Sequence, residues 1–152
     1  MQRVKLLVIF SLIVCFSASA QNKERWRKIE NNSFSFSLPI SFKKTPEVGI
    51  DSFVQAYAIK QMRLSFDYGS YSPDFRDWPA NTKIERVTIN GRAATIGTVA
   101  RPIQKGYPYS TQVYFKVADN QALSMFAACK TEEQIKLARR IFETISFKTK
   151  PA

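Results

Sequence analysis

Apolar and polar residues alternate along much of the chain, beginning with Phe34, Phe36 and Leu38, which serines separate and Pro39 follows. A period of two places neighbouring side chains on opposite faces, so this pattern predicts a half-buried strand that ends at the proline. Six later segments carry related patterns and predict strands at residues 53–59, 62–68, 84–89, 92–99, 111–117 and 121–128.

Short polar dipeptides join these predicted strands in pairs. Asn90-Gly91 predicts a type I′ hairpin, because both residues tolerate the positive φ angles that this turn requires. Lys60-Gln61 and Asp119-Asn120 occupy equivalent places between other strands, although neither contains glycine. We therefore expect most strands to pair as antiparallel hairpins.

Residues 131–145 follow a helical period instead. At about 100° per residue, one side of such a helix is apolar and consists of Leu137, Ala138, Ile141, Phe142 and Ile145. The other side carries Lys136, Arg139, Arg140 and Glu143. Thr131 and Gln134 form a capping-box pattern at the start. The sequence thus predicts an α+β fold, in which a meandering antiparallel sheet of about seven strands has a C-terminal amphipathic helix packed on one face.

Three of these features resemble the Mog1/PsbP-like group of small secreted or lumenal domains, which includes bacterial DcrB-like proteins. They are the strand 34–38 ending in Pro39, the hairpin sequence at 87–93, and the closing strand and helix. The resemblance covers most of the chain after residue 20 and implies the architecture. It leaves the function open, because members of the group share a fold and differ in activity.

The first 20 residues have the pattern of a secretory signal peptide. Arg3 and Lys5 precede an apolar run at residues 6–16, and Ala18-Ser19-Ala20 supplies a small-residue cleavage site. A membrane anchor is the alternative, but the run is well short of the ~20 residues that a spanning helix needs. We expect cleavage after Ala20, one globular domain at residues 21–152 without a transmembrane segment, and a periplasmic or extracellular location.

The formal net charge is +11, and removal of Arg3 and Lys5 leaves +9. A protein of this charge is expected to associate with an anionic partner, such as lipid headgroups, an acidic wall polymer or an acidic protein. Nucleic acid is not expected, because the chain is predicted to be exported and carries no nucleic-acid motif. The densest basic cluster surrounds Trp26 and is predicted to be a solvated first turn or arm, with a functional arm as the alternative: Lys23, Arg25, Arg27 and Lys28.

Catalytic chemistry has few candidates in this chain. There is no histidine, and Cys129 is the one cysteine left after loss of Cys15, so neither a disulfide nor a Cys-His or Ser-His arrangement is expected. Cys129 closes an apolar run and is predicted to be a buried core thiol. We expect no metal and no cofactor. Carboxylates leave one enzymatic alternative, a small hydrolase that uses Asp74 and Asp77.

Two predicted loops, at residues 69–82 and 101–110, are long for connections between strands. Their candidate ligand-binding residues are Tyr71, Asp74, Arg76, Trp78, Arg101, Tyr107 and Tyr109. Aromatic anchors beside orienting charges are typical of binding surfaces, although the same side chains also pack loops onto a core. The sequence therefore favours a non-enzymatic binding domain of the cell envelope, with a candidate site where these loops meet.

Overall fold

A computed structural model describes residues 24–47, 49 and 52–148. The expected signal peptide, its cleavage site after Ala20, and Lys23 of the basic cluster lie outside the described residues. Within them the chain forms two antiparallel sheets and one helix, which confirms the predicted α+β class.

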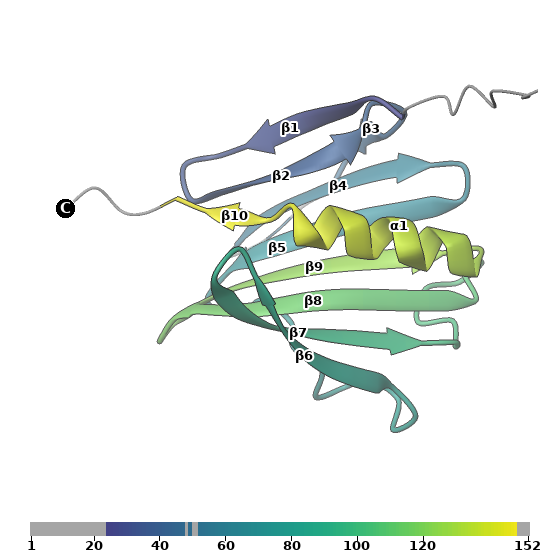
Figure 1. The fold of residues 1–152 in the computed structure, drawn as a ribbon. Coiled ribbons are helices and arrows are strands. Elements are labelled where there is room, and N and C mark those ends of the chain that lie inside the picture. The colour runs from purple at the N-terminus through teal and green to yellow at the C-terminus, as the bar shows by residue number, and fades with distance from the viewer. Residues whose placement is uncertain (1–23, 48, 50–51, 149–152) are drawn as a thin grey trace, which may run out of the picture.

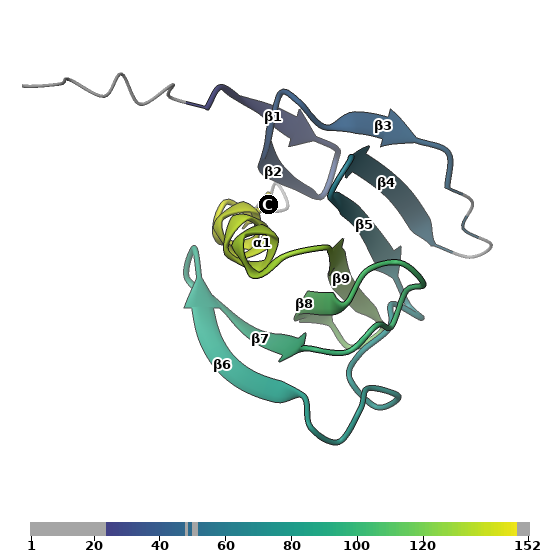
Figure 2. The ribbon, with the colours of Figure 1, turned by 90° about the vertical axis from the view of Figure 1, so that its right-hand side faces the viewer.

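The larger sheet has seven strands in the spatial order β3-β4-β5-β9-β8-β7-β6. Their bounds are β3 Lys43–Thr45, β4 Phe53–Ile59, β5 Met62–Gly69, β6 Lys83–Ile89, β7 Arg92–Val99, β8 Tyr109–Ala118 and β9 Gln121–Cys129. The smaller sheet has the order β1-β2-β10, with β1 Trp26–Glu30, β2 Phe34–Pro39 and β10 Ser146–Phe147. Figures 1 and 2 show the strands curving as an open half-barrel around helix α1, Glu132–Glu143.

All seven predicted strands are present, and three further strands were missed. β1, β3 and β10 are short or highly charged, with the sequences WRKIE, KKT and SF, so none has an alternation long enough to detect. The prediction of a solvated first turn or arm around Trp26 is wrong for residues 26–30, because every one of these residues pairs with a residue of β2. The simple meander is also wrong, since β5 pairs with β9 and not with β6.

The predicted turns are present, and Asn90-Gly91 has the expected conformation. Asn90 and Gly91 have φ angles of 47° and 79°, which fit a type I′ turn. Lys60-Gln61 and Asp119-Asn120 also connect neighbouring strands, and the β8–β9 pairing has a register shift between Lys116 and Ala118, just before Asp119-Asn120.

Helix α1 fills the concave face of the half-barrel. Its apolar side is fully buried at Ala138, Ile141 and Phe142, and Ile145 is buried just beyond it. Each large apolar side chain stabilises the fold by roughly 1.5–3 kcal/mol on transfer from water. The capping box is wrong in detail, because Thr131 occupies the N-cap position without a side-chain cap hydrogen bond.

Polar contacts join the helix to both walls of the half-barrel. Arg140 lies 5.0 Å from the centroid of the Trp26 ring on β1, while Arg139 forms an ion pair with Glu85 on β6. At the helix C-terminus, the Asn90 side-chain amide donates to the carbonyl oxygens of Glu143 (3.2 Å) and Ile145 (2.8 Å). The tip of the β6–β7 hairpin is thereby drawn towards the helix.

Candidate functional site

The first predicted loop runs as a strap across the outer face of the large sheet. β5 ends at Gly69, which pairs with Ala122, whereas β6 begins at Lys83, which pairs with Thr98. These two positions lie at opposite ends and on different strands of the sheet. Residues 70–82 therefore cross the sheet, and the contacts of Phe75 with Gly97 and of Trp78 with Phe126 place them on the face that points away from helix α1.

Side chains fasten this strap at its start. Ser72 Oγ accepts a hydrogen bond from the Gly69 N–H (3.0 Å) and lies 2.9 Å from Asp67 Oδ1 and 3.0 Å from the Ala122 carbonyl oxygen. Gln112 Nε2 then donates to the Pro73 carbonyl oxygen (2.9 Å). The first half of the strap is thus hydrogen-bonded to the sheet beneath it.

The aromatic residues of the strap pack on the sheet. A Cβ atom placed on Gly97 would overlap the Phe75 ring, so this ring occupies the space that the glycine leaves open. Trp78 makes edge-to-face contacts with Phe75 (centroids 5.2 Å apart) and Phe126 (6.2 Å). The indole predicted as a ligand anchor is therefore half-buried in the strap's own packing.

The structure does not gather the predicted loop residues into one site. Tyr71 is 81% exposed and lies where β5 ends, near Ala122. Arg101 and Tyr107 belong to the loop between β7 and β8, at the other end of the sheet, where Tyr109 pairs with Cys129. The part of β9 between Ala122 and Cys129 spans roughly 23 Å at about 3.3 Å per residue.

Tyr109 faces the opposite side of the sheet from the strap. Its side chain packs against the core and lines a hollow of about 300 Å³ beside the first turns of α1. Tyr109 therefore does not join Tyr71 or Trp78 in a common pocket.

Asp74 and Arg76 are brought together, but they bind each other. The Arg76 Nε lies 2.9 Å from Asp74 Oδ2, and the Arg76 backbone N–H donates to Asp74 Oδ1 (2.9 Å). This backbone hydrogen bond is the main cause of a lowered pKa at Asp74. A general acid needs a raised pKa, so the lowered pKa of Asp74 does not favour that role. The hydrolase alternative stays a prediction.

A cleft opens elsewhere, where β7 and β8 separate. The two strands pair only between Val99 opposite Ser110 and Thr95 opposite Tyr114. Residues 92–94 of β7 pair only with β6, whereas residues 115–118 of β8 pair only with β9. On the inner side, the Phe147 ring packs against Phe115 of β8 (centroids 5.1 Å apart) and lies under the Arg92 guanidinium of β7 (4.7 Å). The separation therefore forms a depression on the outer face of the sheet.

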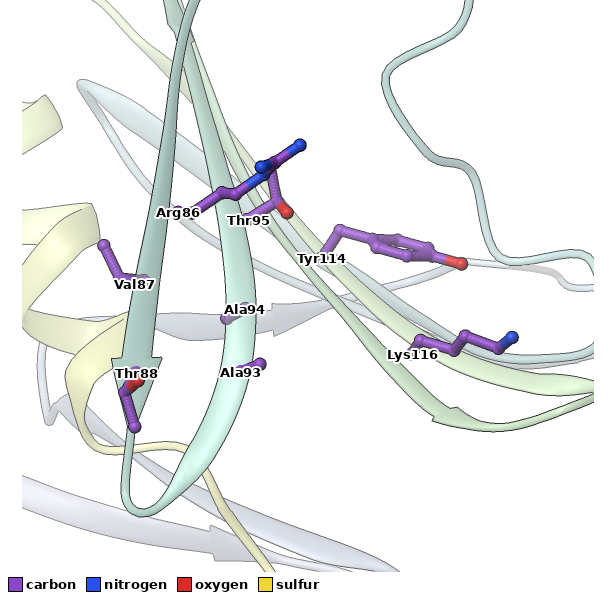
Figure 3. Close-up of a pocket in the computed structure, with 8 residues that line it drawn as sticks. All are labelled: Arg86, Val87, Thr88, Ala93, Ala94, Thr95, Tyr114 and Lys116. Atoms are coloured by element: carbon purple, nitrogen blue, oxygen red, sulfur yellow. The ribbon is translucent and has the colours of Figure 1, made fainter.

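The cleft has a volume of about 470 Å³ and a lining from three strands. Figure 3 shows Arg86, Tyr114 and Lys116 projecting from the outer face, whereas Val87 points towards the helix. The remaining lining residues are Thr88, Ala93, Ala94 and Thr95. Small side chains thus form the floor, with two cations and one aromatic ring around it.

The cations of the cleft have little internal compensation. Lys116 Nζ lies 3.9 Å from a fully exposed Asp119, which is a weak, solvated pair. Arg86 has no ion-pair partner among the residues that the structure describes. Arg76 of the strap is paired with Asp74, which is the main cause of its raised pKa, so this residue adds no net charge to the cleft. The potential over the cleft is therefore expected to be positive.

The sequence patterns did not predict this cleft. Arg86, Tyr114 and Lys116 occupy alternate positions of ordinary strands, where polar residues simply indicate the solvent face. What makes them a site is the loss of pairing between two strands, which depends on tertiary contacts of the hairpin tip.

Searches against protein-family models and curated proteins find no match to this chain. Within the described ranges, no group of three acidic or cysteine residues is placed to hold a metal ion. The one helix of that part is too short to cross a bilayer.

Proposed function

We propose that this chain is an exported, non-enzymatic binding domain that takes up an extended acidic segment of another envelope protein in the cleft between β7 and β8. The observation that carries the proposal is the end of β7–β8 pairing at Thr95 and Tyr114 beside two cations. The signal-peptide pattern of residues 1–20 supports export.

Unpaired backbone groups favour a peptide ligand. Ile89 and Arg92 flank a two-residue turn, so they exchange hydrogen bonds with each other, and alternation directs the N–H and C=O of Ala93 towards β8. Continuation of the β7–β8 register would place Lys116 opposite Ala93, but that pair is absent. Each residue thus has backbone groups available to an added strand.

Charge favours an acidic segment over a neutral one. An extended peptide points alternate side chains to the same face, so acidic residues at every second position would face Arg86 and Lys116 together. Tyr114 adds a half-buried ring with an outward hydroxyl group, which suits contact with the intervening residues.

A labelled hexapeptide of alternating Glu and Thr tests the proposal by fluorescence anisotropy. Exposed ion pairs contribute about 0.2–1 kcal/mol each, so replacing Arg86→Gln and Lys116→Gln together should weaken binding by roughly two- to thirtyfold. The matched control is Arg101→Gln with Lys105→Gln, which removes the same charge from the other end of the sheet and should leave binding nearly unchanged.

Two further peptides separate strand pairing from charge attraction alone. The same hexapeptide with alternate N-methylated residues keeps its charge and loses backbone donors, so it should bind much more weakly. A Lys-Thr hexapeptide should not bind. Equal binding of the methylated and unmethylated acidic peptides, or equal losses in both charge variants, would refute the cleft as a strand-pairing site.

A further inference from the structure

A second surface lies at the opposite end of the molecule from the cleft. It comprises the Lys60-Gln61 turn, Lys130 after β9, the loop at residues 101–108 and the start of α1. The Lys130 N–H donates to the Gln61 carbonyl oxygen (3.0 Å), and the Lys130 ammonium lies 5.8 Å from the centroid of the Tyr107 ring. We call this set of segments the basic end; it is the right-hand end in Figure 1 and faces the viewer in Figure 2.

Positive charge is concentrated and uncompensated at the basic end. Its exposed basic residues are Lys60, Arg101, Lys105, Lys130 and Lys136. None of the five makes an ion pair within the part of the chain that the structure describes. Two acidic residues, Glu132 and Glu133, lie on the first turn of α1, where the positive end of the helix dipole favours them. The net charge of this end is therefore positive.

The tip of the loop adds an apolar group between two cations. Ile103 is 44% exposed and sits between Arg101 and Lys105, with exposed Pro102 beside it. Tyr107 follows after a turn in which its N–H donates to the Gln104 carbonyl oxygen (3.1 Å). A projecting aliphatic side chain, flanked by cations and a tyrosine, has the composition of a membrane-interface contact.

From this geometry we propose that the basic end docks reversibly on an anionic phospholipid surface, with the loop tip at Ile103 entering the headgroup region. The cations attract the anionic headgroups, and the isoleucine provides apolar contact. The proposal does not depend on the function of the cleft. Lys116 lies about 23 Å along β8 from Tyr109, so the cleft would stay accessible on docked protein.

Vesicle sedimentation tests this with the processed protein purified after export, because the apolar run at residues 6–16 would itself enter bilayers. The protein should bind vesicles of phosphatidylcholine with phosphatidylglycerol, and should not bind phosphatidylcholine alone. Arg101→Gln with Lys105→Gln should lower vesicle affinity by roughly tenfold or more, since each juxtamembrane cation contributes about fivefold. Ile103→Ser should lower it severalfold with no change of charge.

Two matched controls distinguish this surface from general attraction to a cationic protein. Arg86→Gln with Lys116→Gln removes equal charge at the cleft, and Arg25→Gln with Lys28→Gln removes equal charge at β1. Both should leave vesicle binding nearly unchanged.

The proposal would be overturned by no binding to the anionic vesicles, equal losses in all three charge variants, an unchanged affinity of Ile103→Ser, or a loss confined to the β1 variant. Full displacement by soluble glycerophosphoglycerol would also overturn it, because it would indicate a headgroup pocket in place of a surface contact. Thermal unfolding of each variant establishes that it is folded.

Discussion

Burial determines the chemistry of Cys129. The side chain is fully enclosed, and loss of hydration by the thiolate raises the pKa of this thiol from an ordinary 9.0 to about 12. At neutral pH the group is therefore a protonated thiol held away from solvent. This arrangement suits a packing residue, since thiol reagents attack the thiolate.

The raised pKa makes a prediction about alkaline stability. The unfolded thiol loses its proton near pH 9, whereas the folded thiol retains it to about pH 12. The contribution of the protonated thiol to the free energy of unfolding is therefore complete below pH 9 and is lost as the pH rises from 9 to about 12. The slope should approach about 1.4 kcal/mol per pH unit. Urea unfolding between pH 9 and 11 should thus show a steeper fall in the free energy of unfolding for the natural protein than for Cys129→Ala.

Parallel slopes in the two proteins would contradict this interpretation. The comparison with Cys129→Ala is required because Tyr57, whose pKa is also raised by burial, titrates in the same region and affects both proteins equally. Labelling of native Cys129 by a thiol reagent at neutral pH should be slow until the chain is unfolded.

At the scale of elements, the strap over the outer face depends on a glycine in the strand beneath it. Gly97→Ala would force the Phe75 ring from its place, and such overpacking typically costs about 1–3 kcal/mol. In a Phe75→Ala background the atoms nearest to the added methyl group are removed, so the same substitution should cost much less. Unfolding free energies of the two single variants and the double variant provide the measurement.

Additive costs in this cycle would show that the ring is not held over Gly97. Ala93→Gly offers a matched glycine/alanine exchange on β7 outside the strap, where no coupling to Phe75 is expected. A further consequence concerns Trp78: its edge-to-face contact with Phe75 should be weakened in the displaced ring, so tryptophan fluorescence should change in Gly97→Ala.

Periodicity was sufficient to predict the strands that bury an apolar face and the helix that covers them, because burial imposes a regular pattern on those segments. It failed for β3 and β10, which have only three and two residues and are strands because they pair with β4 and β2. Asn90 shows a further limit: the sequence predicts its turn, but its bonds to the carbonyl oxygens of Glu143 and Ile145 depend on contacts between distant segments.

The candidate site was less predictable than the fold. Loop aromatics such as Tyr71 and Trp78 look the same in the sequence whether they bind a ligand or pack on a sheet. Only the structure distinguishes an 81% exposed ring from one that packs against Phe75 and Phe126. The two proposed surfaces arise from where strands end or separate. Single-residue patterns do not encode those positions.

For the molecule as a whole, the proposed lipid contact and the cleft lie at opposite ends of β8. A domain docked through Ile103 would present the cleft away from the bilayer, at a height set by the strand, roughly 23 Å. The acidic peptide and the phospholipid surface are both anionic, so a protein with one diffuse basic surface would bind each of them alone but not both at the same time. Two separate surfaces predict simultaneous binding.

Cosedimentation of the labelled Glu-Thr hexapeptide with phosphatidylglycerol-containing vesicles measures this directly. The natural protein should carry the peptide into the vesicle pellet. Arg86→Gln with Lys116→Gln should pellet without the peptide, because only the cleft is weakened. Arg101→Gln with Lys105→Gln should stay in the supernatant with the peptide bound, because exposed charges about 23 Å apart are screened from each other over about 8 Å at physiological ionic strength. If added peptide instead releases the natural protein from the vesicles, the two ligands compete for one surface, and the separation of the cleft from the basic end has no functional meaning.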